Sequence, residues 1–404
     1  MTNIFANRIQ QIPTSFIREI LQYANQPGVI SFAGGIPEEN LFPVKEIQES
    51  TQRVLMNQST NALQYGPTEG SLALREQIVQ RYKTKGVQLT ADNILITSGS
   101  QQGLDLIAKL FLEKDRHVIV EAPTYLGALQ CFSQYECKFD EVPLLPDGPD
   151  TDELKYLLWA SHKQVAFMYM IPDFQNPTGV QYSLERRKAL GNIMQYYAKW
   201  MIEDAPYVEL NYGDEQLPSM LELFPENTIQ LGSFSKVWAP GMRLGWIAAP
   251  TIIIQQLKLL KQASDLHSSS FVQEIMLDVL QNGGIDDHIN KIREVYGERR
   301  NAMVEALQEC SDFLDFESPN GGMFCWAEMK EGNAEAFNRM CIEKKVVFVP
   351  GAHFYAKEKN PRTLRLNFSK NNPDMIWKGV EGLRSVWESK YAQRTPEMMG
   401  RWFL

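Results

Sequence analysis

The segment 94–112 reads ILITSGSQQGLDLIAKLFL and contains the pattern on which the fold prediction rests. A short apolar run at 94–97 leads into a turn with Gly99, and apolar residues then recur at helical spacing. Similar apolar runs occur at 117–120, 165–170, 200–202 and 229–231, separated by helix-period segments. Near-continuous apolar runs suit strands that are covered on both faces. The alternation therefore predicts an α/β protein with a mainly parallel central sheet and helices on both faces.

The length of 404 residues suggests more than one domain, and the pattern changes after about residue 285. A long charged helix is expected at 287–310, followed by short strands among helices. We predict three parts: an N-terminal arm and the start of a small domain at 1–45, a large domain at 46–285, and a C-terminal small α+β domain at 286–404.

The composition excludes several classes of protein. With 40 Lys and Arg against 49 Asp and Glu, the formal charge is −9, which argues against a nucleic-acid partner. The five cysteines form no Cys-x-x-Cys pair, and no His-Glu-x-x-His occurs, so neither a disulfide scaffold nor a metal site is expected. No apolar stretch is long enough for a membrane span or resembles a secretory signal, and we expect a cytoplasmic protein.

The turn after residue 97, with Gly99 and Ser100, could bind a phosphate. A glycine-containing turn that opens a helix presents backbone N–H groups and the positive end of the helix dipole. Two nucleotide motifs do not match. The Walker A pattern is absent, and the spacing from Gly99 to Gly103 does not fit the Gly-x-Gly-x-x-Gly of dinucleotide-binding folds. A simple tight turn remains the alternative.

The segment 231–243 places a lysine directly after an expected strand. Lys236 follows Ser233 and Ser235, and Arg243 lies seven residues further on. A lysine in a partly dry pocket near another cation loses pKa and can act as a nucleophile. Its neighbouring hydroxyls and the planar guanidinium of Arg243 are groups that bind phosphate.

Polar residues follow two more expected strands. Asp204 and Tyr207 follow the run at 200–202, and Asn176 lies in a turn after the run at 165–170. Ligands of open α/β sheets bind at the carboxyl ends of strands, although Asp204 could instead cap a helix and Asn176 could simply form a turn. A phosphate cradle, a lysine, an acid, a tyrosine and an asparagine together match the needs of pyridoxal 5'-phosphate.

On these residues the chain resembles the fold-type I pyridoxal-phosphate-dependent aminotransferases of class I/II, and within them the 2-aminoadipate (LysN-type) and kynurenine/aminoadipate aminotransferases. The matching segments run in order through nearly the whole chain. They are SFAGGIPEENLFP (31–43), LQYGPTEG (63–70), TSGSQQGLDL (97–106), EAPTYLGAL (121–129), IPDFQNPTG (171–179), EDAPYVEL (203–210), LGSFSKVWAPGMRLGW (231–246), PNGGMFCW (319–326), VFVPGAHF (347–354) and LRLNFS (364–369).

The resemblance implies a role for each matching residue. Lys236 would bind the cofactor's aldehyde carbon, Asp204 would pair with its ring nitrogen, and Arg365 would bind the α-carboxylate of the substrate. Tyr207 and Asn176 would hydrogen-bond the ring oxygen, with Asn176 also facing the substrate. The residues that would hold the phosphate are Ser100, Gln101, Ser233, Ser235 and Arg243.

Four further roles follow from the same resemblance. Tyr125 would stack on the ring, and Tyr65 would reach the phosphate of the neighbouring subunit in a homodimer with shared active sites. Gly35 and Arg18 would come from the N-terminal arm and contact the substrate. One departure is Glu203-Asp204, where relatives often have Asp-Asp, which leaves the loop after Asp204 in question.

The implied activity is amino-group exchange by a ping-pong mechanism. The donor would be an L-amino acid (2-aminoadipate, glutamate, aromatic or branched), and the acceptor would be a 2-oxo acid such as 2-oxoglutarate. Two alternatives stay open. One is a pyridoxal-phosphate-dependent C–S lyase or decarboxylase, and the other is a non-catalytic regulatory domain that binds the same cofactor.

Overall fold

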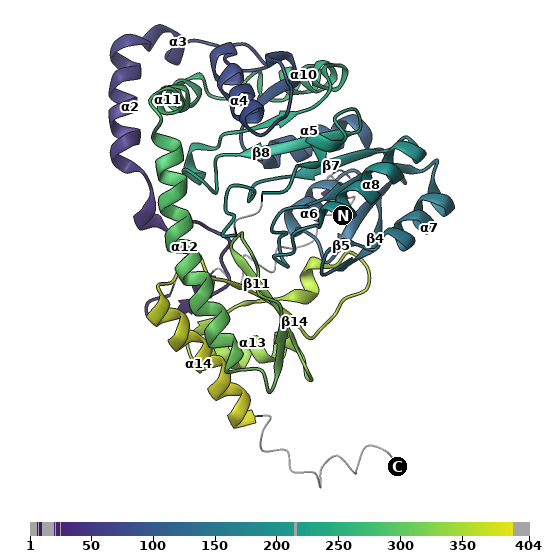
Figure 1. Ribbon diagram of the computed structural model, residues 1–404, viewed down its shortest axis with the longest axis vertical. Helices are drawn as coiled ribbons and strands as arrows, with labels where there is room; N and C mark the ends of the chain where they lie inside the picture. The colour runs from purple at the N-terminus through teal and green to yellow at the C-terminus, as the bar shows by residue number, and fades with distance from the viewer. Residues whose placement is uncertain are drawn as a thin grey trace.

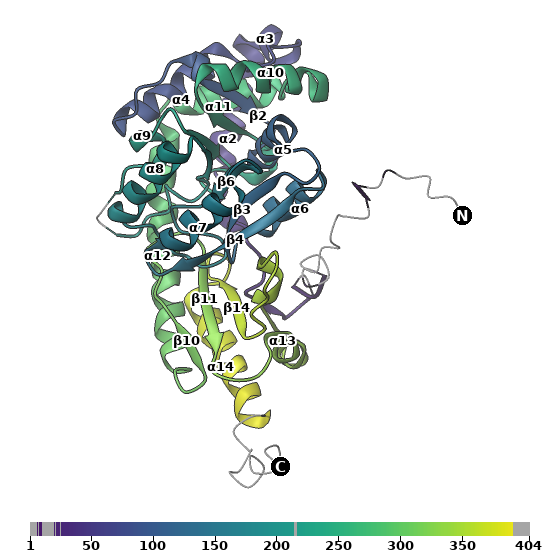
Figure 2. The ribbon, with the colours of Figure 1, turned by 90° about the vertical axis from the view of Figure 1, so that its right-hand side faces the viewer.

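The computed structural model describes residues 6, 8–9, 20, 22–24, 26–213 and 216–390, so Arg18 lies outside the described residues. Two units are stacked along the long axis of the molecule (Figures 1 and 2). The upper unit is built on a large sheet, and the lower unit on a small sheet from the C-terminal part of the chain.

The large sheet has the strand order β2-β9-β8-β7-β6-β3-β4-β5. Adjacent strands among β8, β7, β6, β3 and β4 pair in parallel, whereas β9 and β5 pair antiparallel with their neighbours. The strands are β2 (Ile94–Thr97), β3 (His117–Ala122), β4 (Lys138–Leu145), β5 (Gly148–Pro149), β6 (Val165–Met170), β7 (Trp200–Asp204), β8 (Thr228–Ser233) and β9 (Gly245–Ala248). The predicted mainly parallel sheet is confirmed.

Helices cover both faces of this sheet because successive strand residues point to opposite sides. Val118 and Val120 pack with α5 (Ser100–Phe111), α6 (Leu126–Ser133) and α10 (Thr251–Asp265), whereas Ile119 packs in the opposite cluster. The helices of that other side are α4 (Leu72–Thr84), α7 (Thr151–Ser161), α8 (Leu184–Tyr197), α9 (Met220–Leu223) and α11 (Ser270–Gln281).

The small unit contains an antiparallel sheet of order β10-β11-β14-β13. The N-terminal segment joins this unit, because β1 (Ile30–Ser31) pairs in parallel with β12 (Val346–Val347). Its other elements are β10 (Leu314–Phe316), β11 (Phe324–Met329), β13 (Val349–Pro350), β14 (Thr363–Asn367), α13 (Ala334–Glu343) and α14 (Pro373–Lys390).

Helix α12 (Gly284–Gln308) runs through both units (Figure 1). Ile285, Ile289 and Ile292 belong to a hydrophobic cluster of the large unit, whereas Met303 and Leu307 belong to that of the small unit. The predicted domain boundary at 285/286 therefore falls at the start of a helix that both cores share.

The fold also includes several strands that the sequence pattern does not predict. Strand β4 carries polar side chains near the sheet edge, β9 (GWIA) begins with glycine, and β10 is only three residues long, so their apolar patterns are weak. The remaining elements are α2 (Val44–Asn57), α3 (Ser59–Leu63), and the 3₁₀ turns η2 (Glu39–Leu41), η3 (Ala91–Asn93), η4 (Pro240–Met242) and η5 (Gly351–Phe354).

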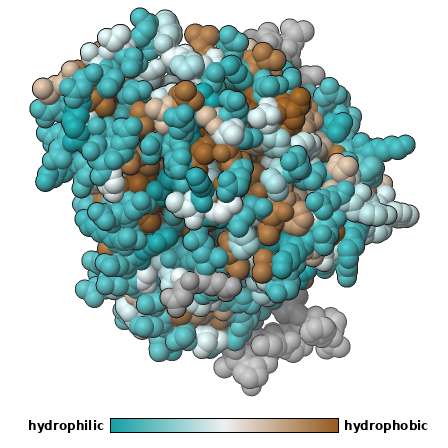
Figure 3. Space-filling view, turned by 45° about the horizontal axis from the view of Figure 1, so that its top comes forward, coloured by the Kyte–Doolittle hydropathy of each residue, from teal (hydrophilic) through white to brown (hydrophobic). Residues whose placement is uncertain are grey.

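The surface is mixed, with apolar residues gathered in places among hydrophilic ones (Figure 3). Large exposed apolar side chains occur on α2, on α3 and in the loop that follows, namely Met56, Leu63 and Tyr65. No helix within the described ranges has the length and apolar character needed to cross a bilayer.

Gly297 lies in the interior of α12, and we predict that replacing it with alanine stabilises the protein. Glycine in a helix interior costs about 0.5–1 kcal/mol relative to alanine, and a methyl group at Gly297 would meet only Tyr212 at an ordinary 3.9 Å. Gly297→Ala should therefore raise the free energy of unfolding by that amount in urea titrations. The matched control is Gly191 of α8, where the added carbon would lie 1.8 Å from the Phe224 ring. Gly191→Ala should destabilise by about 1–3 kcal/mol, and the same sign for both variants would contradict the argument.

Candidate active site

A cavity of about 350 Å³ lies where the carboxyl ends of the parallel strands face the N-terminal segment and the small unit. It is lined by residues that lie far apart in the sequence. Those predicted from the sequence are Gly35, Ser100, Gln101, Tyr125, Asn176, Asp204, Tyr207, Ser233, Ser235, Lys236, Arg243 and Arg365. Tyr65 does not line the cavity of its own chain, and its side chain is largely exposed.

The sheet topology explains this convergence. Strand β7 ends at Asp204 and β8 ends at Ser233, while β2 and β3 end shortly before Ser100 and Tyr125. Carboxyl ends of parallel strands meet at one edge of a sheet, and connecting loops bring the next few residues to the same edge.

The turn between β2 and α5 forms the end of the cavity suited to an anion. Gly99 has φ +82°, and a Cβ there would lie 2.5 Å from Nη2 of Arg243, so only glycine fits this close approach. Ser100 opens α5, whose first backbone N–H groups have no partner within the helix. Arg243 donates to the carbonyl of Ser98 at 3.3 Å. A cation and a helix N-terminus therefore lie side by side.

Lys236 lines the cavity and lies three residues after the end of β8. Its Nζ donates to the carbonyl of Gly35 at 2.8 Å. Burial and the nearby cation of Arg365 lower the pKa of Lys236 to about 8, with Asp204 acting in the opposite direction. At physiological pH this amine is consequently neutral, and so nucleophilic, more often than an ordinary lysine.

Asp204 is buried and has one carboxylate oxygen without a partner. Its Oδ2 accepts a 2.7 Å hydrogen bond from the hydroxyl of Tyr169, whereas its Oδ1 has no hydrogen-bond partner. Burial raises the pKa of the Asp204 carboxyl to about 6, although the Tyr169 hydrogen bond and Lys236 oppose the rise. Buried polar atoms are normally paired, so Oδ1 is suited to a donor on a bound molecule.

Glu203 resolves the departure noted in the sequence. Its carboxylate accepts from the backbone N–H groups of Met220 and Leu221 at 2.9 and 3.0 Å, at the start of α9. The residue that caps α9 is Ser219, which accepts from the backbone N–H of Glu222. Asp204, the last residue of β7, caps no described helix and faces the cavity.

Arg365 reaches the cavity from β14 of the small unit. It donates to Oδ1 of Asn176 at 2.8 Å and to the carbonyl of Ala33 at 2.8 Å, while its Nε has no partner. Burial lowers the pKa of Arg365 to about 10, so the guanidinium stays charged at neutral pH. Asn176 in turn donates to the hydroxyl of Tyr207 at 3.3 Å, which connects the cation to the ring-facing side of the cavity.

Sequence reasoning missed three aromatic residues of the site. Tyr169 bonds Asp204, and the rings of Phe324 and Phe354 lie 4.3 and 5.0 Å from the guanidinium carbon of Arg365. Tyr169 was hidden in an apolar strand. A buried tyrosine hydroxyl nevertheless needs a partner, and that requirement was the available signal.

These groups fit pyridoxal 5'-phosphate. The unpaired Oδ1 of Asp204 suits a protonated ring nitrogen, the depressed pKa of Lys236 suits attack on an aldehyde, and Arg243 with the α5 N-terminus suits a phosphate. The fit depends on the whole set of residues. A nucleotide cofactor would have no group that needs Lys236 or Asp204.

Comparison with known proteins agrees with this chemistry. Residues 27–383 match the family model of aminotransferase class I and II. The chain belongs to this aminotransferase family. It is 40% identical over 389 residues to aromatic-amino-acid aminotransferase 1 of Thermococcus litoralis, covering 94% of this chain and 93% of that one. It is 38% identical over 385 residues to 2-aminoadipate transaminase of Thermus thermophilus, covering 94% and 95%.

A solved structure gives the same result. The α-aminoadipate aminotransferase LysN of Thermus thermophilus, complexed with N-(5'-phosphopyridoxyl)-L-leucine, superposes with a TM-score of 0.87 at 37% identity and covers 95% of this chain and 97% of that one. The protein is therefore a pyridoxal-phosphate-dependent aminotransferase, and transamination is favoured over the lyase, decarboxylase and regulatory alternatives.

Because Asp204 is buried, we predict that its charge lowers the free energy of unfolding although transaminase activity requires it. The pKa of Asp204 in the folded state lies above its ordinary value, so ionisation of Asp204 destabilises the fold. This destabilisation is absent below pH 3.8 and reaches its full size above about pH 6. At about 1.4 kcal/mol per pKa unit, the cost approaches roughly 3 kcal/mol. Cofactor-free Asp204→Asn should be more stable than wild type at pH 8 in urea titrations, with the difference shrinking toward pH 4, and it should lose transaminase activity.

Asp173 offers the matched control. It is equally buried but forms a 2.6 Å ion pair with buried Arg187. Asp173→Asn should destabilise the protein by about 3–5 kcal/mol, because it leaves the arginine unpaired. A wild type that is more stable than Asp204→Asn at pH 8 would refute the interpretation of Asp204.

Proposed function

We propose that the protein is a broad-specificity aminotransferase that couples glutamate and 2-oxoglutarate to a second pair. That pair would be 2-aminoadipate or an aromatic or branched amino acid with its 2-oxo acid. The observation that carries the proposal is one cavity that holds a depressed-pKa lysine, a half-paired buried aspartate and a buried arginine. The names of its relatives, which include an aromatic-amino-acid and a 2-aminoadipate enzyme, support the substrate range.

Each residue has a distinct task in this proposal. When bound, pyridoxal phosphate supplies an aldehyde that captures the amino group and a ring that withdraws electrons from the substrate's α-carbon. Lys236 takes the proton from the substrate's α-carbon and would deliver it to the former aldehyde carbon of the cofactor, because a pKa of about 8 lets the amine hold or release a proton near neutrality. Asp204 keeps the ring nitrogen protonated by ion pairing in a water-poor site.

The remaining residues bind and orient. Arg365 presents its guanidinium to the substrate's α-carboxylate, and its stacking against Phe324 and Phe354 fixes the plane of that group. Ser100, Gln101, Ser233, Ser235 and Arg243 hold the phosphate, Tyr125 covers the ring, and Tyr207 with Asn176 contacts the ring oxygen. Gly35 forms the wall contributed by the N-terminal segment.

We also propose a cytoplasmic homodimer in which Tyr65 completes the neighbouring subunit's site. Tyr65 is 79% exposed, and it follows closely in the chain after two other exposed apolar residues, Met56 of α2 and Leu63 of α3. Exposed apolar groups that lie near one another favour an interface. A phenol hydroxyl at such an interface can donate to a phosphate across it.

The decisive experiment compares wild type with Lys236→Ala. Wild type should bind pyridoxal phosphate with a change in its absorbance. It should also transfer amino groups from glutamate to the 2-oxo acids that correspond to 2-aminoadipate and to the aromatic and branched amino acids. Lys236→Ala should lose activity by at least about 10³-fold, because it removes both the nucleophile and the proton carrier. Lys258→Ala is the control and should remain active, because the Lys258 side chain is partly exposed on α10 and does not line the cavity. Release of ammonia and pyruvate without an oxo acid would instead indicate a lyase.

Substitution of Arg18 tests how the enzyme accepts both acidic and apolar amino acids. We propose that it binds the distal carboxylate of glutamate or 2-aminoadipate and is displaced by apolar side chains. Arg18→Ala should then lower kcat/KM for these acidic donors by about tenfold, the value of one charged hydrogen bond, and leave leucine and phenylalanine nearly unchanged. Equal losses for acidic and apolar donors would exclude this role.

A further inference from the structure

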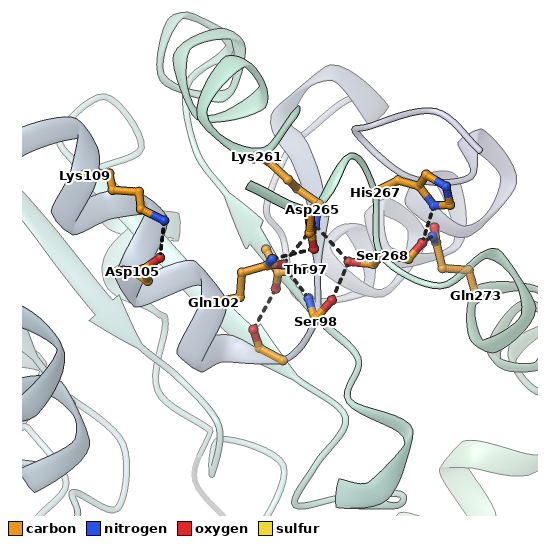
Figure 4. A network of polar contacts seen from close by, with 11 residues as sticks. Thr97, Ser98, Gln102, Asp105, Lys109, Lys261, Asp265, His267, Ser268 and Gln273 are labelled. Atoms are coloured by element: carbon orange, nitrogen blue, oxygen red, sulfur yellow. Dashed lines mark hydrogen bonds and ion pairs between the residues drawn. The ribbon is translucent and has the colours of Figure 1, made fainter. Parts of the chain in front are cut away.

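A polar cluster built around the buried side chain of Lys261 lies directly behind the turn suited to phosphate (Figure 4). It comprises Lys261 and Asp265 of α10, Gln102 of α5, and Ser98 and Ser268 from the adjoining loops. None of these residues lines the cavity. The side chain of Lys261 is fully buried, which is rare for lysine and calls for a physical reason.

The ammonium group of Lys261 has an acceptor for each of its three protons. Its Nζ lies 2.9 Å from Oε1 of Gln102, 2.9 Å from Oδ1 of Asp265 and 3.1 Å from Oγ of Ser268. A lysine carries three donors and no acceptor. The group is therefore saturated, and its orientation is fixed by three separate segments of the chain.

Lys261 in turn fixes the side-chain amide of Gln102. Oε1 of that amide accepts from Lys261 and from the backbone N–H of Ser98 at 2.8 Å, while its Nε2 donates to Oδ2 of Asp265 at 2.6 Å. With both ends of the amide occupied, Gln102 cannot rotate without breaking an ionic contact. The backbone of Ser98 is thereby held from behind.

Ser98 connects the cluster to the anion-facing groups. Its carbonyl accepts from Nη2 of Arg243, and Gly99 and Ser100 follow it directly in the chain. Its hydroxyl lies 3.1 Å from that of Ser268. The direction in which the turn presents its N–H groups, and the position of the arginine, thus both depend on how Ser98 is held.

We propose that Lys261 is a positioning residue for the cofactor phosphate: through Gln102 and Ser98 it holds the β2–α5 turn and Arg243 in the geometry that binds the dianion. The proposal rests on the phosphate-site assignment given above. Lys261 does not touch the phosphate itself. Its contacts hold the turn in one conformation, where water alone would leave the turn free to move. The turn therefore needs little rearrangement when the phosphate binds.

The same cluster extends to the loop that carries Tyr65. The carbonyl of Ser268 accepts from Nδ1 of His267, whose Nε2 lies 3.2 Å from the backbone nitrogen of Gly66. A neutral imidazole that donates from Nδ1 accepts the Gly66 N–H through Nε2. The two loops proposed to contact phosphate are therefore held by one polar network.

The test measures binding of pyridoxal phosphate and of pyridoxal, which lacks the phosphate, to cofactor-free Lys261→Met. Methionine keeps the length of the side chain and removes the charge and the donors. Affinity for pyridoxal phosphate should fall by about tenfold or more, as expected for losing charged hydrogen bonds. Affinity for pyridoxal should change by less than about twofold, since Lys236 and Asp204 are untouched.

Two further variants complete the design. Lys109→Met removes another lysine that pairs with an aspartate four residues away, Asp105 on α5, and should leave both affinities unchanged. Ser268→Ala removes one contact to Lys261 and the contact to the Ser98 hydroxyl, while the ammonium keeps its other acceptors, so it should still fold and show a smaller loss confined to pyridoxal phosphate.

The outcomes are distinct. Unchanged affinity for pyridoxal phosphate in Lys261→Met and Ser268→Ala, or equal losses for both ligands, would overturn the proposal and make Lys261 a general structural residue. A wild type that binds neither ligand would instead refute the site assignment.

Discussion

The site depends on one electrostatic constraint, a carboxylate that is held out of water with a partner for only one of its two oxygens. Tyr169 binds Oδ2 of Asp204, and Oδ1 is buried without a donor. Such an arrangement is unfavourable in isolation. It becomes favourable when a cationic ring nitrogen supplies the missing hydrogen bond. The same burial that costs stability therefore provides the driving force for placing a protonated heterocycle against Asp204.

The parallel sheet explains how this constraint can be met by distant parts of the chain. Asp204 and Ser233 end adjacent strands, and Lys236 follows three residues after the second of them. Arg365 arrives from a separate antiparallel sheet and bonds Asn176 of the large unit. The cavity thus lies at the contact between two rigid scaffolds, so side chains from both are fixed by packing rather than by loop conformation alone.

Much of this arrangement was predictable because strand ends are visible in the sequence. The runs before Ser100, Asn176, Asp204 and Lys236 are strongly apolar. A polar residue after each run indicates the edge of the sheet where ligands bind. Residues that support the site without lining the cavity give no such signal in the sequence. Tyr169 and Lys261 reveal their roles only through contacts between β6 and β7, or between α10 and α5. The short strand β9, reversed relative to its neighbours, was also missed, because it begins with glycine and has only two large apolar residues, Trp246 and Ile247.

Helix α12 has a consequence for how the molecule unfolds. Its first turns complete a core of the large unit and its last turns complete the core of the small unit, within one continuous run of backbone hydrogen bonds. Melting either core strips the packing from half of this helix and exposes the ends of the remainder. Thermal denaturation of the two units is thereby coupled, and calorimetry would register a single cooperative transition rather than two independent ones.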